Sequence, residues 1–491
     1  MGLPQALNMA VAEMMSGACL ALQLNPLLTQ GQIEALEHHA SDDLKALYLP
    51  KLISGEWSGT MNLTEPGAGS DVGALVTKAE PNGDGTYRVT GQKIYITWGD
   101  SDVTENVCHL VLARLPGAPT GTKGISLFMV PKFIPDENGR PGVPNDLRVV
   151  SLEHKLGIHG SPTCVMSFEG AKGWLVGQEH KGMAAMFTMM NTARLAVGLQ
   201  GLGLSDRALQ NANRYARERL QSRAPGGARY PDKAADPIVV QPDVRRMLLT
   251  CRALVEGGRL LGYHAVSLVD VMACAPDEAE RKEAAALVDF LTPIVKACLT
   301  EWGVECTYHA LQCFGGHGYI REHGMEQLAR DARITTLYEG TTGIQALDLV
   351  GRKLLQLQGE GLRAFLGMIE SFCRSHGDDP ALQEFIAPLR QQAQDWAALS
   401  QEIAARAQAN PDEIGAASVD YLFYSGYVAL AYWWARSVAA AEASAQSMGF
   451  KAAKRETARF YFARILPRTL AHRAAIDAGA ATLMVLPDEA F

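Results

Sequence analysis

The segment LYEGTTGIQ, residues 337–345, sets a single carboxylic acid between an aromatic ring and a Gly-Thr-Thr turn. Glu339 could serve there as a general base, because burial raises a glutamate pKa from about 4.3 towards the working pH. The structural alternative is a favourable interaction with the start of a helix capped by Thr341 or Thr342. In isolation, the segment favours this structural alternative.

Two other segments carry groups that could hold a ligand. MNLTEPGAGSDVG, residues 61–73, combines glycines that let backbone amides approach a ligand with the hydroxyls of Thr64 and Ser70, a set suited to a phosphate or a flavin edge. In KIYITWG, Tyr95 and Thr97 fall on one face of an alternating strand. That pair could contact a planar heterocycle, although a core-facing pair is the commoner arrangement.

Hydrophobic periodicity predicts the elements that position these residues. Apolar spacings of three and four predict helices over residues 6–24 and 33–52 and again after residue 182. Residues 59–176 instead contain short runs separated by Gly, Pro, Asn and Asp, typical of a compact β domain with PNGDG as a hairpin loop. The segment QCFGGHGY, residues 312–319, is typical of a helix C-cap followed by a loop.

Composition excludes several classes of protein. The chain has 491 residues, 47% hydrophobic and 20% charged, enough for roughly three packed units. Without an apolar run of ~20 residues or a basic N-terminal flank, we expect no transmembrane segment, no secretory signal and a cytoplasmic protein. The nine cysteines lack a CxxC pair, so we expect reduced core residues and no metal site.

The segments LTEPGAGSD, KIYIT, QCFGGHGY and RDARITTLYEGTTGIQ, in this order, resemble the acyl-CoA dehydrogenase family of flavoenzymes. The resemblance covers roughly residues 4–355, and its first and last motifs are specific. With EHKLGIHGSPT, residues 153–163, the chain looks most like the branch with an extra C-terminal helical domain, which includes 3-methylmercaptopropionyl-CoA dehydrogenases. The family usually carries further helices before the point where this chain begins.

The resemblance implies an α+β multidomain fold. It comprises N-terminal helices, a central β-barrel-like domain, a C-terminal four-helix bundle and an appended helical domain. The expected boundaries are residues 1–57, 58–178, 179–357 and 358–491. Because the appended helices should cover a face that shorter relatives use to form tetramers, we expect a homodimer.

The resemblance also implies the reaction. Glu339 would remove the proton alpha to a thioester while the beta carbon delivers hydride to FAD, giving the 2-enoyl-CoA. Electrons would then pass to electron-transfer flavoprotein, and the substrate would be 3-methylmercaptopropionyl-CoA or another short or medium acyl-CoA. The resemblance implies that the residues in contact with FAD are Met61, Leu63, Thr64, Gly69, Ser70, Tyr95, Thr97, Arg219, Gln312, Gly315, Gly316 and Thr341. Substrate contacts fall to Ser70, Asn191, Arg194 and Gly340.

Two alternatives stay open. An acyl-CoA oxidase shares the half-reaction on substrate and differs in the access of oxygen to reduced flavin. A DNA-associated member of the same fold is suggested by GFKAAKRETARFYFAR, where Lys451, Arg455 and Arg459 would share a helix face. A solvated basic face explains that run equally well, and the net charge of -8 favours the enzyme, so we expect no nucleic acid.

Overall fold

The computed structural model describes residues 3–491, apart from the side chain of Asn191. The chain divides into two compact units. One is Cys19–Arg194, and the other joins the N-terminal residues up to Ala18 with Leu195–Phe491. The four domain boundaries expected from the sequence remain a prediction.

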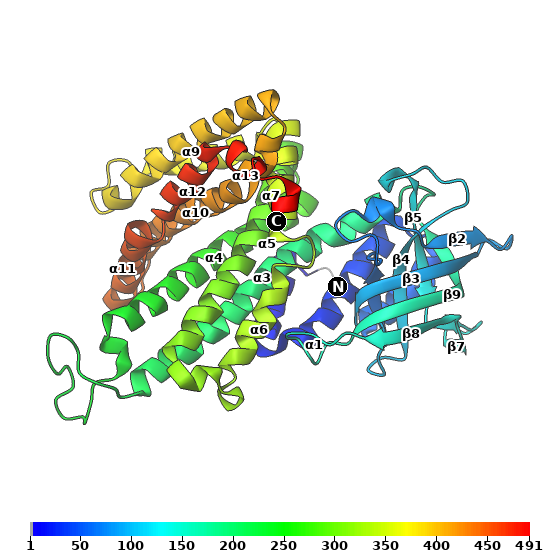
Figure 1. Ribbon diagram of the computed structural model, residues 1–491, viewed down its shortest axis with the longest axis horizontal. Coiled ribbons are helices and arrows are strands. Elements are labelled where there is room, and N and C mark those ends of the chain that lie inside the picture. The colour runs from blue at the N-terminus through cyan, green and yellow to red at the C-terminus, as the bar shows by residue number, and fades with distance from the viewer. Residues whose placement is uncertain (1–2) are drawn as a thin grey trace. The chain divides into compact units, whose positions relative to one another are not determined.

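The first unit contains the β domain, whose strands close into a ring (Figure 1). Around the ring β4 pairs with β5, β5 with β9, β9 with β3, β3 with β2, and β2 with β4 through Lys78 and Arg114. The predicted β-barrel-like domain is therefore confirmed, as is the hairpin between β2 and β3. The strands are β1 (Trp57–Asn62), β2 (Lys78–Pro81), β3 (Tyr87–Thr97), β4 (Asn106–Arg114), β5 (Ile125–Pro131), β6 (Phe133–Pro135), β7 (Pro141–Pro144), β8 (Leu147–Leu152) and β9 (Thr163–Val176).

The N-terminal helices break at a different place from the one expected. We predicted separate helices over residues 6–24 and 33–52, but α1 runs over Gln5–His39 and passes through Pro26, with extended backbone at Cys19 (φ −161°, ψ 94°). The chain breaks instead at Cys19, where two helical segments of α1 meet at a kink, and before α2 (Asp42–Ser54), where Ser41 accepts a hydrogen bond from the Leu44 N–H. The Ser41 cap marks where α2 begins, which apolar periodicity alone does not determine.

The apolar character of α1 bears on the prediction that the chain has no transmembrane segment. Within the described residues, α1 is the one helix long and apolar enough to cross a membrane, and a third of its most apolar window is buried. Packed helices of soluble cores meet the same criterion. In this helix the buried Glu13 carboxylate receives hydrogen bonds from Arg259 and Tyr263, which is the environment of a protein interior.

The second unit is helical. It is built mainly from long helices that follow the β domain in the sequence. The helices predicted from periodicity are present, and α6, a short helix that periodicity did not reveal, lies between α5 and α7. The helices are α3 (Gly182–Glu218), which belongs to this unit from Leu195 on, α4 (Pro242–Cys274), α5 (Glu278–Cys313), α6 (Met325–Thr335) and α7 (Thr342–Leu347), which continues as a π-helix over Asp348–Gln356. The fold class predicted from the sequence is confirmed.

The appended helices pack around α10 (Figure 1). The middle of this helix, from Tyr421 to Ala435, is almost entirely buried, and the helix contacts α4, α5, α7, α9, α11 and α12. Trp434 on α10 donates its indole N–H to the Ala253 carbonyl of α4 at 3.0 Å. The helices are α8 (Glu360–Ser375), α9 (Gln383–Ala409), α10 (Asp412–Ala443), α11 (Met448–Arg464), α12 (Arg468–Ala478) and α13 (Ala481–Met484).

The cysteines follow the expectation with two exceptions. All nine are free thiols, and seven are buried. Cys19 and Cys274 are exposed, so the prediction that all of them are core residues is wrong for these two. Cys19 lies at the kink of α1, and Cys274 ends α4, where a helix terminus reaches solvent.

Candidate active site

Glu339 lies on the turn between α6 and α7. Its backbone adopts the left-handed conformation, with φ of +55°, and so does that of Gly340, with φ of +92°. A left-handed conformation is strained for glutamate and persists only where the surroundings fix it. The turn must therefore be held by contacts from outside its own residues.

Two buried side chains hold this turn by its carbonyl oxygens. Gln345 Nε2 donates to the Glu339 carbonyl at 3.0 Å, and Lys296 Nζ donates to the Gly340 carbonyl at 2.6 Å. Gln345 is 1% exposed and Lys296 is fully buried. A Cβ on Gly340 would lie 2.7 Å from Gln345 Nε2, so this position accepts glycine alone.

The aromatic residue before Glu339 is also fixed. The Tyr338 hydroxyl donates to Gln200 Oε1 at 2.5 Å. Burial, together with the carboxylates of Glu339 and Asp331, raises the pKa of Tyr338 well above its usual range. Tyr338 therefore remains a neutral hydrogen-bond donor at physiological pH.

The helix after Glu339 begins as expected. Thr341 is the N-cap of α7, and its hydroxyl oxygen accepts from the Ile344 N–H at 3.3 Å. The next residue, Thr342, donates its hydroxyl to Glu301 Oε1 at 2.5 Å. Thr341 was one of two candidate caps, and the structure selects it.

The glycine-rich segment after β1 forms a tight turn. The Glu65 N–H donates to the Ala68 carbonyl and the Ala68 N–H to the Glu65 carbonyl, both at 3.0 Å. The Thr64 carbonyl accepts from the Ile94 N–H at 3.0 Å, which fixes the segment to β3. Of the residues predicted to contact FAD here, Met61, Leu63 and Thr64 are half-buried, and Gly69 and Ser70 are exposed.

A buried ion pair supports that turn, and sequence analysis did not identify it. Glu65 is 3% exposed and Lys93 is fully buried, with Lys93 Nζ 2.8 Å from Glu65 Oε1 and 3.0 Å from the Leu63 carbonyl. The Glu65 carboxylate also accepts from the Thr77 hydroxyl and N–H and from the Val76 N–H. Nothing in the sequence around Lys93 indicates that its partner lies 28 residues away.

Burial and pairing set the charges of this ion pair. Burial lowers the pKa of Lys93 to about 8, against the opposing effect of Glu65. Burial alone would raise the pKa of Glu65, but Lys93, Thr77 and Val76 together hold it below its usual value. At neutral pH both groups are charged, so the Glu65 carboxylate has a structural role in this ion pair.

The strand that should place Tyr95 and Thr97 on one face is irregular. The pairing of β3 with β9 shifts between Lys93 and Ile96, and Tyr95 in this bulge has φ of +60°. The regular alternation behind our prediction is therefore interrupted there. Tyr95 is 61% exposed, whereas Thr97 is half-buried opposite Thr163.

Four of the predicted FAD contacts belong to the helical unit and are exposed: Arg219, Gln312, Gly315 and Gly316. The structure brings their two segments together through aromatic contacts. Tyr215, whose carbonyl accepts from the Arg219 N–H, stacks on Phe314 with ring centroids 4.1 Å apart. Its hydroxyl lies 2.8 Å from Nδ1 of His317.

The predicted CoA-side residues lie on α3. Arg194 is half-buried, and its guanidinium lies 5.9 Å from the ring centroid of Phe187. Arg194 Nε is buried and has no hydrogen-bond partner among the described residues, so it retains a donor. The side chain of Asn191 lies outside the described residues.

The glycines of both segments leave room for a ligand. At Gly67, Gly69 and Gly316 the backbone is not left-handed, and an added Cβ would meet no protein atom within 4 Å. Neither conformation nor packing requires glycine at these three positions. The open space beside these glycines fits the flavin cofactor that the sequence resemblance implies.

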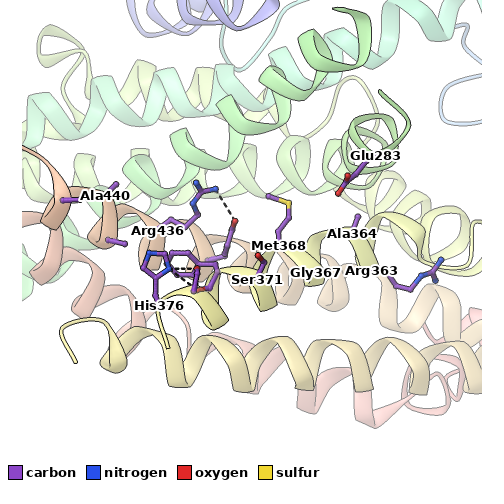
Figure 2. Close-up of a pocket in the computed structure, with 14 residues that line it drawn as sticks. Glu283, Arg363, Ala364, Gly367, Met368, Ser371, His376, Arg436 and Ala440 are labelled. Atoms are coloured by element: carbon purple, nitrogen blue, oxygen red, sulfur yellow. Dashed lines mark hydrogen bonds between the residues drawn. The ribbon is translucent and has the colours of Figure 1, made fainter. Parts of the chain in front are cut away.

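A hollow lies elsewhere in the helical unit. A cavity of about 820 Å³ opens between α8 and α10, with Glu283 of α5 at one end and Arg436 and His376 at the other (Figure 2). None of the predicted site residues lines it. Among the described residues no cluster of three metal-binding side chains occurs.

Three family models match the chain. Residues 60–171 match the acyl-CoA dehydrogenase middle domain, and residues 180–355 match the acyl-CoA dehydrogenase C-terminal domain. Residues 365–487 match a domain described as acetyl-CoA dehydrogenase C-terminal like. The third match falls on the helices that surround α10.

Curated relatives span most of the chain. A 3-methylmercaptopropionyl-CoA dehydrogenase of Ruegeria pomeroyi is 45% identical over 95% of this chain and 79% of its own length. A broad-specificity linear acyl-CoA dehydrogenase of Mycobacterium tuberculosis is 34% identical, covering 100% of this chain and 83% of its own. Among solved structures, an acyl-CoA dehydrogenase from Bacillus anthracis complexed with FAD has a TM-score of 0.77 at 22% identity, covering 97% of this chain and 78% of its own, which shows the shared fold.

Proposed function

The chain belongs to the acyl-CoA dehydrogenase family, and we propose that it converts an acyl-CoA to the 2-enoyl-CoA with Glu339 as the general base. The observation that carries this proposal is the turn around Glu339, whose strained backbone is held by two buried donors from neighbouring helices. Folds keep such strain where it positions a reacting group.

FAD, when bound, supplies the acceptor for the hydrogen that leaves the beta carbon with its electron pair. The protein acts on the other half of the substrate. The Glu339 carboxylate takes the proton from the alpha carbon, and the electrons of that C–H bond form the new double bond. The backbone amide at the base, Glu339, donates to the thioester carbonyl, where negative charge grows as the proton leaves.

For the cofactor, we propose that the loops at residues 61–70 and 312–316 hold FAD. The supporting observation is the space that Gly67, Gly69 and Gly316 leave open. The exposed hydroxyl of Ser70 and the half-buried hydroxyls of Thr64 and Thr97 add donors on the β unit. Tyr95 supplies an exposed ring at the bulge of β3.

For the substrate, we propose a short or medium acyl-CoA, with 3-methylmercaptopropionyl-CoA as the first candidate. A relative named 3-methylmercaptopropionyl-CoA dehydrogenase is 45% identical over 95% of this chain. Arg194 retains a buried donor that suits an anionic CoA group. We further propose a cytoplasmic homodimer that passes electrons to electron-transfer flavoprotein.

One experiment addresses cofactor, reaction and substrate together. Purified protein, reconstituted with FAD, is mixed without oxygen with a panel of acyl-CoA thioesters that includes 3-methylmercaptopropionyl-CoA, and loss of flavin absorbance is followed. We expect bleaching with at least one short or medium thioester. A protein that binds FAD but is bleached by none of them would refute the proposed reaction.

The oxidase alternative is separated by the second half-reaction. Rapid peroxide formation with the best acyl-CoA in air, and without an added acceptor, would support an oxidase. Slow reoxidation in air that becomes fast on adding electron-transfer flavoprotein is the result we expect.

The DNA-associated alternative loses its main support in the structure. On α11 Arg455 pairs with Glu384 and Glu442, Arg459 pairs with Glu384 and Glu456, and the Lys451 ammonium donates to the Glu442 carbonyl. The two arginines are therefore paired with carboxylates within the chain. Salt-dependent binding to duplex DNA, steep in log salt, would restore this alternative.

A further inference from the structure

The cavity between α8 and α10 is lined by an arginine whose charge the chain does not neutralise. This residue, Arg436 of α10, lies at one end of the cavity (Figure 2). Its Nη1 donates to the Tyr432 hydroxyl at 3.3 Å, and its guanidinium lies 5.2 Å from the ring centroid of Trp433. In the part of the chain that the structure describes, Arg436 forms no ion pair with a carboxylate.

Other arginines of the appended helices differ from Arg436 in this respect. Arg468 pairs with Glu305 at 2.7 Å, and Arg473 pairs with Glu402 at 2.6 Å. A guanidinium without a carboxylate partner has N–H donors left for an anion from outside the chain. The aromatic contacts and the bond to Tyr432 hold the Arg436 side chain in place, so that less side-chain entropy is lost when an anion binds.

Two further polar side chains of the cavity come from α8. His376 Nδ1 lies 2.9 Å from Ser375 Oγ and 3.1 Å from the Phe372 carbonyl, and Nε2 of the same ring has no hydrogen-bond partner among the described residues. The hydroxyl of Ser371, one turn before Ser375, is exposed and makes no hydrogen bond to those residues either. These groups add hydrogen-bonding capacity beside the Arg436 guanidinium.

Away from its ends, the cavity has mostly small and apolar walls. Its lining runs from Arg363 to Ser375 on α8 and from Tyr432 to Ala443 on α10, which is about 17 Å of each helix at 1.5 Å per residue. A volume of about 820 Å³ lies within the range of about 300–1,000 Å³ that is typical of ligand sites. The apolar and small wall residues are Ala364, Met368, Phe372, Ala439, Ala440 and Ala443.

A glycine in the wall of this cavity has no evident role within the chain. Gly367 lies inside α8, where glycine destabilises a helix relative to alanine. Its backbone is not left-handed, and an added Cβ would meet no protein atom within 4 Å. Since neither conformation nor packing requires glycine here, the open space beside it is available to a bound molecule.

We propose that this cavity binds a carboxylic acid with an apolar chain, whose carboxylate pairs with Arg436 and whose chain lies along the small side chains of α8 and α10. Arg363 and Glu283 line the opposite end and have opposite charges, so the cavity favours a single negative charge beside Arg436. None of the residues assigned to FAD or to acyl-CoA lines it. The site is therefore independent of the proposed reaction.

Calorimetric titration of the purified protein with decanoate and with decanol tests the proposal, at concentrations below those at which decanoate forms micelles. The native protein should bind decanoate about ten- to a hundredfold more tightly than decanol, because a hydrogen bond between charged groups is stronger than one to a neutral hydroxyl. Octanoate should bind more weakly than decanoate, by up to about fourfold for each CH₂ group removed. A native protein that binds neither decanoate nor decanol would overturn the proposal.

The informative variant is Arg436→Gln, which removes the charge and keeps a polar side chain. It should weaken decanoate binding by about ten- to a hundredfold and leave decanol binding unchanged. The control is Arg374→Gln on α8, whose arginine pairs with Glu370 and does not line the cavity, and which should change neither affinity. An unchanged decanoate affinity in Arg436→Gln, or an equal loss for decanoate and decanol, would overturn the proposal.

A second variant covers the case in which Arg436→Gln does not fold. Gly367→Leu places a side chain in the open space of the cavity, and leucine favours a helix more than glycine does, so the melting temperature should not fall. This variant should lose the binding of both decanoate and decanol. A fatty acid that binds at the acyl-CoA site instead would be insensitive to both substitutions. Native affinity for decanoate in Gly367→Leu would therefore place the ligand elsewhere and overturn the proposal.

Discussion

Two glutamates lie in glycine-rich segments of this chain, and they differ in whether the side chain or the main chain is bound by neighbouring groups. Glu65, beside Gly67 and Gly69, directs its carboxylate into the β domain, where Lys93 and two backbone N–H groups bind it. At Glu339, beside Gly340, the anchors described above bind the main chain, through the carbonyls of both residues.

The difference is consistent with the proposal that Glu339, and not Glu65, is the general base. A carboxylate that is buried and saturated with donors has a lowered pKa and cannot take a proton near neutral pH. At Glu339 the two anchors bind backbone carbonyls, so they fix the position of the residue without depending on its carboxylate. This arrangement supports Glu339 over Glu65 as the proposed base.

The largest expected effect is on the reaction rate. Glu339→Gln should retain FAD and bind acyl-CoA, yet lose at least about 10²- to 10⁴-fold in flavin reduction, because the amide cannot accept the alpha proton. Anaerobic stopped-flow absorbance at the flavin band measures the loss. Bleaching within a few-fold of the native rate would place the base elsewhere and remove the contrast with Glu65.

The next effect is on stability and cofactor retention. Lys93→Met leaves the Glu65 carboxylate buried without its cation, and breaking a buried pair costs about 3–5 kcal/mol. We expect lower unfolding free energy in urea and weaker FAD binding, since the turn at residues 64–68 loses its support. Arg88→Met is the matched control on the same strand, because its ion pair with Glu80 is exposed and should be worth at most about 1 kcal/mol. Equal losses in the two variants would contradict the role given to Lys93.

A smaller effect should separate cofactor binding from folding. Gly69→Ala adds a methyl group that meets no protein atom within 4 Å, so the apoprotein should unfold at an unchanged urea concentration. FAD should bind about tenfold more weakly, or about 1.4 kcal/mol, because the methyl group occupies the ligand's space. Fluorescence titration with FAD measures this. Gly367→Ala on α8, equally open, is the control that should leave FAD binding unchanged. An unaltered affinity in Gly69→Ala would show that the loop does not contact the cofactor.

The smallest effect is a pH dependence. Because the folded pKa of Glu65 lies below its ordinary value of 4.5, the stability that Glu65 contributes is complete above that value and is lost as the pH falls through the folded pKa. The native protein should therefore exceed Glu65→Gln in unfolding free energy at pH 6 to 7, and the difference should shrink below about pH 4.5. Urea unfolding at a series of pH values measures the difference. A gap that stays constant in acid would mean that the Glu65 charge does not carry it.

Short-range patterns predicted much of this arrangement. The PNGDG hairpin, the cap at Thr341 and the return of helical periodicity after residue 182 each depend on residues close in sequence, and each is confirmed. Apolar periodicity did not locate the breaks of the N-terminal helices, because α1 continues through Pro26 to His39 and is kinked at Cys19.

Long-range partners could not be predicted in the same way. Lys296 lies 44 residues from Gly340, and Lys93 lies 28 residues from Glu65, so no local spacing marks either pair. Gln345 is near in sequence, but its bond depends on two successive left-handed residues that periodicity does not report. The roles assigned to individual FAD and substrate contacts remain predictions.

The burial of the middle of α10, from Tyr421 to Ala435, has a consequence for how the helical unit can be divided. Gly426 approaches Cys298 of α5 so closely that an added Cβ would lie 2.4 Å from its sulfur, and Trp434 fills the surface of α4 beside Ala253. A chain cut after residue 357 would leave that apolar surface of α4 and α5 facing water, and the excised segment would leave α10 equally bare. The bundle and the added helices should therefore melt in one step, and proteases should find no stable fragment at their junction.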